Sequence, residues 1–398
     1  MTKADKEGQR KAPILRFKGF TDAWEQRKLG NLFNERKEKS TKGELLSVTL
    51  SNGVTKFSDL NKKDNSNIKS GNYKVVKKND IPYNSMRMWQ GASGVSSYDG
   101  IVSPAYTVLV PNRNSNSNFY AVLFKKKSIL NLFTRFSQGL TSDTWNLKYP
   151  ILKDIIVPFT NLEEQKRIFK IFNVINNLLA LYDRKLKLIS QVKKYFLDNL
   201  FTKKEYPNLR FKGFTDAWEQ RKLNSIFETV SKKGFPNLPV LTATQTKGMI
   251  YRNNSGIDIK FNKNTLNNYK LVEPNQFVVH LRSFQGGLAA SSIRGIASPA
   301  YTVLRFKDNK QSVNFWKEFF RSKKFINSLV KVTYGIRDGR TIKVTDLLDL
   351  KYQIPSQNLE QCKIGQLINS INKLLTLYET KQQHLTKIKK ILLNTMFI

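Results

Sequence analysis

The 398-residue chain contains one cysteine, Cys362, and two histidines, His280 and His384. A single cysteine excludes a disulfide framework and a cysteine-based metal cluster, and the two histidines do not have the spacing of a metal site. We expect His280 to be a packed or hydrogen-bonded residue of a strand, and His384 to lie on the exposed face of a helix. The sequence therefore predicts no metal.

Long apolar runs are also missing. No stretch reaches the ~18 consecutive apolar residues that a membrane-spanning helix needs. The first residues, MTKADKEGQRKAP, contain no apolar core and are not typical of a signal peptide. Hydrophobic residues nevertheless make up 40% of the chain, which is enough for the cores of two or three domains. These features predict a cytoplasmic protein.

Acidic residues are scarce. The chain has 30 Asp and Glu against 68 Lys and Arg, which gives a formal net charge of +38. A charge of this size indicates a polyanionic partner, which can be DNA, RNA or an anionic membrane surface. The alternative is that the basic residues serve only solubility.

The chain is a tandem duplication. The motif LRFKGFTDAWEQRKL occupies residues 15–29 and recurs without change at 209–223, and SPAYTVL occurs at 103–109 and again at 298–304. The copies are about 195 residues apart throughout, so the two halves, 14–201 and 208–398, share one plan.

Each half ends in a long stretch, at 162–201 and 359–397, in which apolar residues alternate at spacings of three and four, and the first of these stretches contains no Gly or Pro. This pattern predicts a coiled-coil helix, and about forty residues at ~1.5 Å each give a rod of roughly 60 Å that needs a partner. Core packing explains either helix alone, but two matched copies favour a mutual antiparallel pair, with LLALY (178–182) facing LLTLY (374–378). The expected helix-seam residues are Ile168, Ile171, Ile175, Leu178, Tyr182, Ile364, Leu367, Ile371, Leu374 and Tyr378.

In each half, the sequence between the repeated motif and the long helix predicts a mixed α/β globule. Trp24 and Trp218 are its expected anchors, and Lys18-Gly19 is an expected turn. The expected strands are 45–50, 81–83 and 106–110 in the first half, and 238–244, 276–281 and 301–306 in the second. The stretches 119–136 and 315–330 are expected to be helical.

The repeated motif, the Pro…Glu-Gln step that closes each globule (Pro158 to Gln165, Pro355 to Gln361) and the long helix after it resemble the specificity subunit of type I restriction–modification systems. The resemblance covers nearly the whole chain. It implies a non-catalytic subunit with two target-recognition domains, each reading one half of a split double-stranded DNA sequence. It also implies antiparallel helices that set the spacing of the half-sites and dock two modification (methyltransferase) subunits. Two restriction (motor-nuclease) subunits can join, and S-adenosylmethionine is expected only in the methyltransferase partner.

The expected fold class is therefore α/β (α+β), with two mixed target-recognition domains separated by two long antiparallel coiled-coil helices. The expected segments are a mobile basic tail at 1–13, target-recognition domain 1 at 14–160, a central long helix at 161–202, target-recognition domain 2 at 203–357 and a C-terminal long helix at 358–398.

No catalytic constellation is evident. Ser-Pro-Ala-Tyr at 103–106 lacks the second proline of the amino-methyltransferase motif Asp/Asn/Ser-Pro-Pro-Tyr, and no Gly-rich cofactor turn precedes it. The Gly-rich stretches at 90–94 and 285–287 are not P-loops, because no Gly-Lys-Ser/Thr follows. We expect no catalytic residue and no cofactor in this chain. An autonomous nuclease or methylase, and an RNA-binding or architectural protein without a catalytic partner, are the alternatives.

DNA-contacting residues are predicted from the comparison of the halves. Arg87 aligns with Arg282 and Gln90 with Gln285, so these shared residues are expected to form a fold turn or to contact phosphate. Base readers are expected where the halves differ and long polar side chains occur. The candidates are Lys56, Lys62, Lys63, Arg113 and the loop around Gln138, then Gln245, Lys247, Arg252 and a loop with Arg337 and Arg340 just before Lys343. A solvated surface residue is the alternative for each.

Overall fold

The computed structural model describes residues 12–50, 52–60, 63, 66–244, 247–255, 263–280, 288–335 and 341–398. The chain divides into two compact units, here called unit 1 (Met1–Asp183 with Thr380–Ile398) and unit 2 (Arg184–Glu379). Each unit contains one globule and a part of both long helices. The assignment of 14–160 and 203–357 as target-recognition domains remains a prediction.

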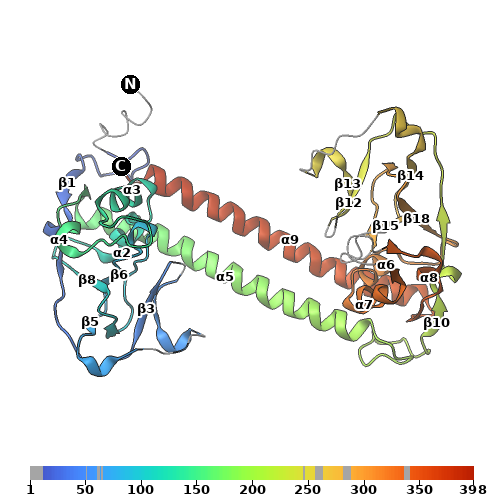
Figure 1. The fold of residues 1–398 in the computed structure, drawn as a ribbon, viewed down its shortest axis with the longest axis horizontal. Coiled ribbons are helices and arrows are strands. Elements are labelled where there is room, and N and C mark those ends of the chain that lie inside the picture. Colours follow the sequence, from blue (N-terminus) through green and yellow to red (C-terminus); the bar gives the residue numbers. More distant parts are fainter. Residues whose placement is uncertain are drawn as a thin grey trace. The chain divides into compact units, whose positions relative to one another are not determined.

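The globule of unit 1 is built from antiparallel strand pairs and short helices (Figure 1). Its strands are β1 (Glu25–Lys28), β2 (Phe33–Glu35), β3 (Leu46–Thr49), β4 (Gly53–Lys56), β5 (Lys74–Val76), β6 (Ile81–Asn84), β7 (Gly100–Val102), β8 (Tyr106–Pro111) and β9 (Ile156–Phe159). Its helices are α2 (Ser117–Leu123), α3 (Lys127–Phe136), α4 (Tyr149–Leu152) and the first part of α5 (Leu162–Leu200). One sheet has the order β2-β8-β6, while β1 pairs with β9, β3 with β4 and β5 with β7. The β1–β9 pairing places the repeated motif beside the strand that leads into α5.

Unit 2 repeats this plan. Its strands are β10 (Glu219–Lys222), β11 (Phe227–Val230), β12 (Leu241–Thr244), β13 (Gly248–Tyr251), β14 (Lys270–Val272), β15 (Phe277–His280), β16 (Ala289–Ala290), β17 (Gly295–Ala297), β18 (Tyr301–Phe306), β19 (Thr333–Tyr334), β20 (Thr341–Ile342) and β21 (Lys351–Ile354). Its helices are α6 (Val313–Phe319), α7 (Lys323–Leu329), α8 (Val344–Asp349) and the first part of α9 (Asn358–Thr395). The pair β10–β21 corresponds to β1–β9, and the sheet β11-β18-β15-β16 extends β2-β8-β6 by one short strand. The predicted fold class is confirmed.

The helical prediction for 119–136 and 315–330 is confirmed, although each stretch is divided into two helices. Asn116 begins α2 and Ser312 begins α6, because each side chain accepts a hydrogen bond from the backbone N–H three residues later. Extended backbone at Lys126 and Ser322 separates the members of each pair. This break lets both helices turn an apolar face towards the core of the globule.

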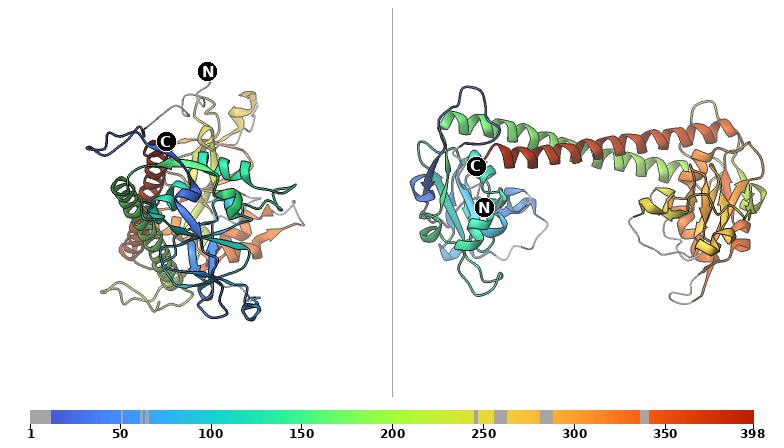
Figure 2. Two further views of the ribbon diagram at one scale, coloured as in Figure 1. Left: turned by 90° about the vertical axis from the view of Figure 1, so that its left-hand side faces the viewer. Right: turned by 90° about the horizontal axis from the view of Figure 1, so that it is seen from above.

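Helices α5 and α9 run antiparallel within each unit (Figure 2). In unit 1 the last turns of α9 lie beside the first turns of α5, and in unit 2 the last turns of α5 lie beside the first turns of α9. Their buried and half-buried side chains form one line with alternating spacings of three and four, which we call the inner seam. The inner seam comprises Ile168, Phe172, Ile175, Leu179, Tyr182, Leu186, Ile189, Lys193, Phe196 and Leu200, and, 196 positions later, Ile364, Ile368, Ile371, Leu375, Tyr378, Gln382, Leu385, Lys389, Leu392 and Met396.

The predicted seam differs from the inner seam at alternate positions. Ile168, Ile175 and Tyr182 lie on it, as do their counterparts Ile364, Ile371 and Tyr378. Leu178 and Leu374 are exposed, at 37% and 45%, and the half-buried residues are their neighbours Leu179 and Leu375. Ile171 and Leu367 are half-buried against the globules, and the inner seam passes through Phe172 and Ile368 instead. The sequence could not decide between two adjacent leucines, because both continue an apolar stripe.

The predicted pairing of LLALY with LLTLY is also wrong. Gln382 donates a hydrogen bond to Asp183, so in an antiparallel pair the residues before Asp183 lie along those after Gln382. The stretch 178–182 therefore packs beside residues that follow LLTLY.

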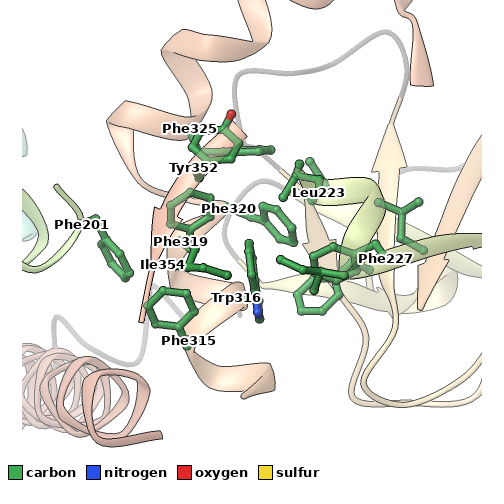
Figure 3. Packing of buried hydrophobic residues seen from close by; sticks show 14 of the residues in the cluster. Phe201, Leu223, Phe227, Phe315, Trp316, Phe319, Phe320, Phe325, Tyr352 and Ile354 are labelled. Carbon is green, nitrogen blue, oxygen red and sulfur yellow. The ribbon is translucent and has the colours of Figure 1, made fainter. Parts of the chain in front are cut away.

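Each globule has an aromatic core that the end of a long helix completes. In unit 1 the ring of Phe397 packs on Trp24, Phe119 and Phe172, with centroid distances of 6.2, 5.2 and 5.7 Å. In unit 2, Phe201 packs on Phe315 and Phe319, beside Trp316, Phe320 and Phe325 (Figure 3). The first aromatic residue after each long helix therefore belongs to the core of the globule where that helix ends.

None of the helices in the described part of the chain is both long enough and apolar enough to span a membrane. Among the same residues, no group of three or more His, Cys, Asp or Glu side chains is arranged to hold a metal ion. His280 packs against the ring of Tyr301 at 5.1 Å, and His384 is exposed.

Candidate nucleic-acid interface

A buried carboxylate fixes each globule to its long helix. Glu164, at the start of α5, accepts hydrogen bonds from the Arg16 guanidinium (2.7 and 2.9 Å), from the Trp24 indole (3.1 Å) and from the Thr160 hydroxyl. In unit 2, Glu360 accepts from Arg210 (2.8 Å twice) and from the indole of the second-half tryptophan (3.2 Å). The repeated motif supplies both donors in both halves, which gives a physical reason for its recurrence.

The glutamine that follows each carboxylate positions the rest of the globule. Gln165 accepts from the backbone N–H of Asn116 and donates to the carbonyl of Thr160. Gln361 accepts from the N–H of Ser312 and donates to the carbonyl of Pro355. The Glu-Gln step therefore joins the long helix to a strand end and to the first globule helix.

Two turns meet at one end of the unit 1 sheet. The backbone of Gly94 lies so close to Gly53 that a Cβ on Gly94 would be 2.9 Å from the Gly53 Cα. Gly53 has a φ of +63° and closes the β3–β4 hairpin, where Thr49 Oγ1 accepts from the N–H of Asn52. Only glycine allows this close approach, so the hairpin turn and the segment 84–94 form one surface. We call 84–94 the recognition turn.

The recognition turn presents Arg87 and Gln90 to solvent. The backbone N–H groups of residues 90 to 93 are used inside the turn, donating to carbonyls of Arg87, Met88 and Gly91. These amides are therefore not available for a phosphate. A phosphate or base contact made by residues 90 to 93 must therefore come from side chains.

The side chain of Lys125 holds the recognition turn in place through hydrogen bonds to its backbone. Its Nζ donates to the carbonyl of Gly91 and, at 3.1 Å, to that of Ser93. Burial, together with the nearby charge of Lys389, lowers the pKa of Lys125 to about 8. The position of the turn therefore depends on a largely buried amine next to helix α9.

A second loop, residues 138–146, stands beside the recognition turn, and we call it the tip loop. Its ends are joined by hydrogen bonds between Gln138 and Asn146, at 3.0 and 2.7 Å. The ring of Trp145 packs edge-on against Trp89 of the recognition turn, with a centroid distance of 5.2 Å. The structure thus brings together three predicted candidates, Arg87, Gln90 and Gln138.

The remaining unit 1 candidates are dispersed. Lys56 is half-buried, 3.8 Å from the Glu44 carboxylate and 5.6 Å above the Tyr98 ring. Lys63 is exposed. Arg113 is exposed just beyond the opposite end of β8 from the recognition turn, because β8 residue Tyr106 pairs with β6 near that turn. Lys62 lies outside the described residues.

In unit 2 the equivalent surface is described in part. Lys247 is exposed in the β12–β13 turn, where Thr244 Oγ1 accepts from its N–H as Thr49 does from Asn52. Arg252 lies at the other end of that hairpin. The Lys343 ammonium is 3.0 Å from Asp346 and 6.0 Å above the Tyr334 ring. Gln245, Arg282, Gln285, Arg337 and Arg340 lie outside the described residues.

The sequence reading missed two features. One is Leu140, at the tip loop, whose side chain is fully exposed. The other is a second apolar line on the long helices, which we call the outer stripe. It comprises Val174, Leu178, Leu181, Leu188, Val192 and Tyr195 in α5, and Leu374, Leu377, Ile388 and Ile391 in α9, all of them exposed. The sequence contained a signal for the outer stripe, because each of its residues directly precedes a residue of the inner seam.

Comparison with known proteins gives one consistent result. The profile of the family "Type I restriction modification DNA specificity domain" matches residues 21–191. The type I restriction enzyme MjaVIII specificity subunit of Methanocaldococcus jannaschii is 24% identical over 346 residues, covering 81% of this chain and 79% of that protein. A protein of the same archaeon described as an MjaX specificity subunit is 23% identical over 315 residues, covering 73% and 69%. The crystal structure of the type I restriction–modification S subunit from M. genitalium has a TM-score of 0.62 at 16% identity, covering 97% and 99% of the two chains.

The fold is similar to that of the M. genitalium S subunit, and the family matched by residues 21–191 is a DNA specificity domain. The chain belongs to the specificity subunits of type I restriction–modification systems. It is the non-catalytic component of such an enzyme and part of a type I complex.

Proposed function

We propose that this subunit reads a split double-stranded DNA target, one half-site with each globule, and recruits two modification subunits along its long helices. Two restriction subunits can complete the complex, which acts on DNA in the cytoplasm. S-adenosylmethionine belongs to the modification subunits. The observation that carries the proposal is the outer stripe, which occurs once in each unit at equivalent positions.

The DNA-reading surface of unit 1 is proposed to be the recognition turn with the tip loop. Arg87 and Gln90 are long, polar and exposed, and side chains of these types recognise guanine and adenine edges in the major groove. With the amides of residues 90 to 93 already used, the exposed Arg87 guanidinium is the group that we propose meets either a base or a phosphate. The net charge of +38 favours tight, salt-sensitive binding.

The outer stripe is proposed to dock the modification subunits. In unit 1 it consists of Val174, Leu178 and Leu181 from α5 and Ile388 and Ile391 from α9. These residues flank the inner seam on one side of each helix, and in an antiparallel pair the same flank of both helices faces the same way. The result is an apolar surface of the kind that marks a protein interface.

The second copy supports a pair of partners. Leu374 and Leu377 occupy the positions of Leu178 and Leu181, 196 residues later, and Val192 and Tyr195 occupy those of Ile388 and Ile391. Equivalent surfaces on two units bind equivalent partners. One methyltransferase per half-site follows, with adenine methylation on both strands.

The test begins with a base-resolution map of adenine methylation in the host genome, with and without the gene. The proposal requires one split motif to lose methylation on both strands. The gene is then returned with Leu178→Lys and Leu374→Lys, which place a charge in each copy of the outer stripe. We expect purified variant protein to bind the motif with unchanged affinity but to lose co-purification with the modification subunit.

Asn177→Lys and Thr376→Lys, exposed substitutions within two residues of those positions, serve as matched charge controls. They should leave both binding and methylation intact. An unchanged methylation map on deletion of the gene, or full methylation by the charged-stripe variant, would contradict the proposal.

A further inference from the structure

We infer that Leu140 is a specificity-determining residue of the first half-site and that it reads the C5-methyl group of a thymine. This inference rests on the proposed DNA-reading function. It assigns a role to an apolar side chain, whereas the candidates predicted from the sequence are all polar.

Leu140 lies in a loop that is closed by hydrogen bonds. Its exposed fraction is 100%, although it is a large aliphatic residue. The tip loop that carries it is closed by Thr141 and Thr144, where the Thr144 hydroxyl donates to the Thr141 carbonyl (3.0 Å) and accepts from the Thr141 N–H (3.1 Å). Gly139 takes a φ of +140°, next to the backbone of Thr144. These contacts direct the side chain away from the globule.

The base of the loop is fixed to the recognition turn. Trp145 packs on Trp89 at 5.2 Å, and the N–H of Leu147 donates to the carbonyl of Ser85 at 2.9 Å. The loop that carries Leu140 is therefore fixed at its base to the turn that carries Arg87 and Gln90, and we infer that a duplex bound by these polar side chains also reaches the leucine.

Base edges in the major groove offer one apolar group, the thymine methyl. The residues around Leu140 are small and polar (Thr141, Ser142, Asp143), so an exposed leucine among them gains most by covering that methyl. Methylation of an adenine in the half-site requires at least one A·T pair there, so a thymine is present. The contact would distinguish thymine from cytosine at one position, without a hydrogen bond.

The experiment is a cycle of protein and DNA changes. The chain is assembled with its modification subunits and bound to duplexes that carry the mapped motif, in which each thymine of both half-sites is replaced in turn by deoxyuridine, which lacks only the methyl. For wild-type protein, one position should lose about fourfold in affinity, the effect of uncovering one methyl group. Leu140→Ala should show the same loss on natural DNA and no further loss on the deoxyuridine duplex.

Leu140→Met, which retains apolar length, should keep most of the discrimination. Ile14→Ala, an exposed aliphatic residue near the opposite end of α3, should change nothing. The complex can prefer its motif while each deoxyuridine substitution lowers the affinity of Leu140→Ala by the same factor as that of wild type. That result overturns the inference and leaves the proposed function standing. If Leu140→Ala weakens assembly with the modification subunits and leaves DNA binding unchanged, the residue contacts protein and the inference is equally overturned. No preference for the motif at all would overturn both.

Discussion

The guanidinium of Arg16 and the carboxylate of Glu164 form a two-pronged hydrogen-bonded ion pair, 148 residues apart in the chain, with atom separations of 2.7 and 2.9 Å. The carboxylate is fully buried and the arginine side chain is 12% exposed. Because a bidentate pair fixes both groups in one plane, it determines where the repeated motif sits on α5. Arg210 and Glu360 form the same pair in unit 2.

Removing Glu164 should destabilise unit 1 strongly. Glu164→Ala leaves a buried arginine without its counter-charge, at a cost of about 3–5 kcal/mol in the free energy of unfolding. Urea unfolding followed by tryptophan fluorescence measures this cost. Glu163→Ala, which removes the exposed ion pair with Arg167, is the control and should cost less than about 0.5 kcal/mol. Equal costs for the two variants would show that the buried pair does not hold the motif.

The inner seam is tested by two adjacent leucines. Leu179 is half-buried against α9, so Leu179→Ala should lower the free energy of unfolding by about 1–2 kcal/mol. Leu178 is exposed, so Leu178→Ala should change it by less than about 0.5 kcal/mol. Thermal unfolding of both variants decides the assignment, and the reverse order would restore the seam that the sequence alone suggested.

The C-terminal residues are expected to be part of the unit 1 core. Phe397 is 2% exposed and packs on the rings of Trp24, Phe119 and Phe172. Phe397→Ala should cost about 3–5 kcal/mol, since it removes a large buried aromatic side chain. Limited proteolysis should then cleave unit 1 sooner, whereas Phe201→Ala should sensitise unit 2. Protection of unit 1 in the Phe397 variant would contradict this role.

The stability of unit 1 should rise with pH just above neutrality. The pKa of Lys125 is about 8 in the folded chain, below the ordinary value of 10.5, because burial disfavours its charged form. Between those values the unfolded chain binds more protons than the folded one, so the free energy of unfolding increases with pH. Lys389 is half-buried, which lowers its pKa as well, so it acts in the same direction.

Burial raises the pKa values of Tyr83 and Tyr120, which reverses the trend above about pH 10, so the useful window is pH 8 to 9.5. Across it, wild-type protein should gain about 2 kcal/mol more than Lys125→Met, as judged from urea titrations at each pH. Lys127→Met, an exposed neighbour, should keep the wild-type slope. Parallel slopes for wild type and Lys125→Met would show that Lys125 does not titrate in this range.

Much of the fold follows from local patterns in the sequence. Both long helices lack Pro and carry a regular apolar stripe, and α5 also lacks Gly, so their existence and length depend on residues close together in the chain. The strand near Ile81 and the anchor at Trp24 were predicted for the same reason, and β6 and the buried Trp24 confirm them. The family resemblance was likewise carried by contiguous motifs.

The candidate site depended on contacts between distant segments. Arg87 and Gln138 share one surface because Trp145 packs on Trp89, whereas Arg113 is separated from them by the length of β8. No spacing rule in the sequence contains that information. In the sequence the candidate polar side chains were indistinguishable, because tertiary packing, and not residue type, determines which of them are exposed on one surface.

The sequence by itself determined the duplication, the two rods, the positive charge and the family, because each is written in residue identity or in local periodicity. The tertiary structure alone decided which leucine faces the partner helix, which carboxylate is buried against Arg16, and that Phe397 completes the core of unit 1. These features depend on which of several apolar or charged side chains is buried when segments more than a hundred residues apart pack together. Local sequence preference does not determine that choice.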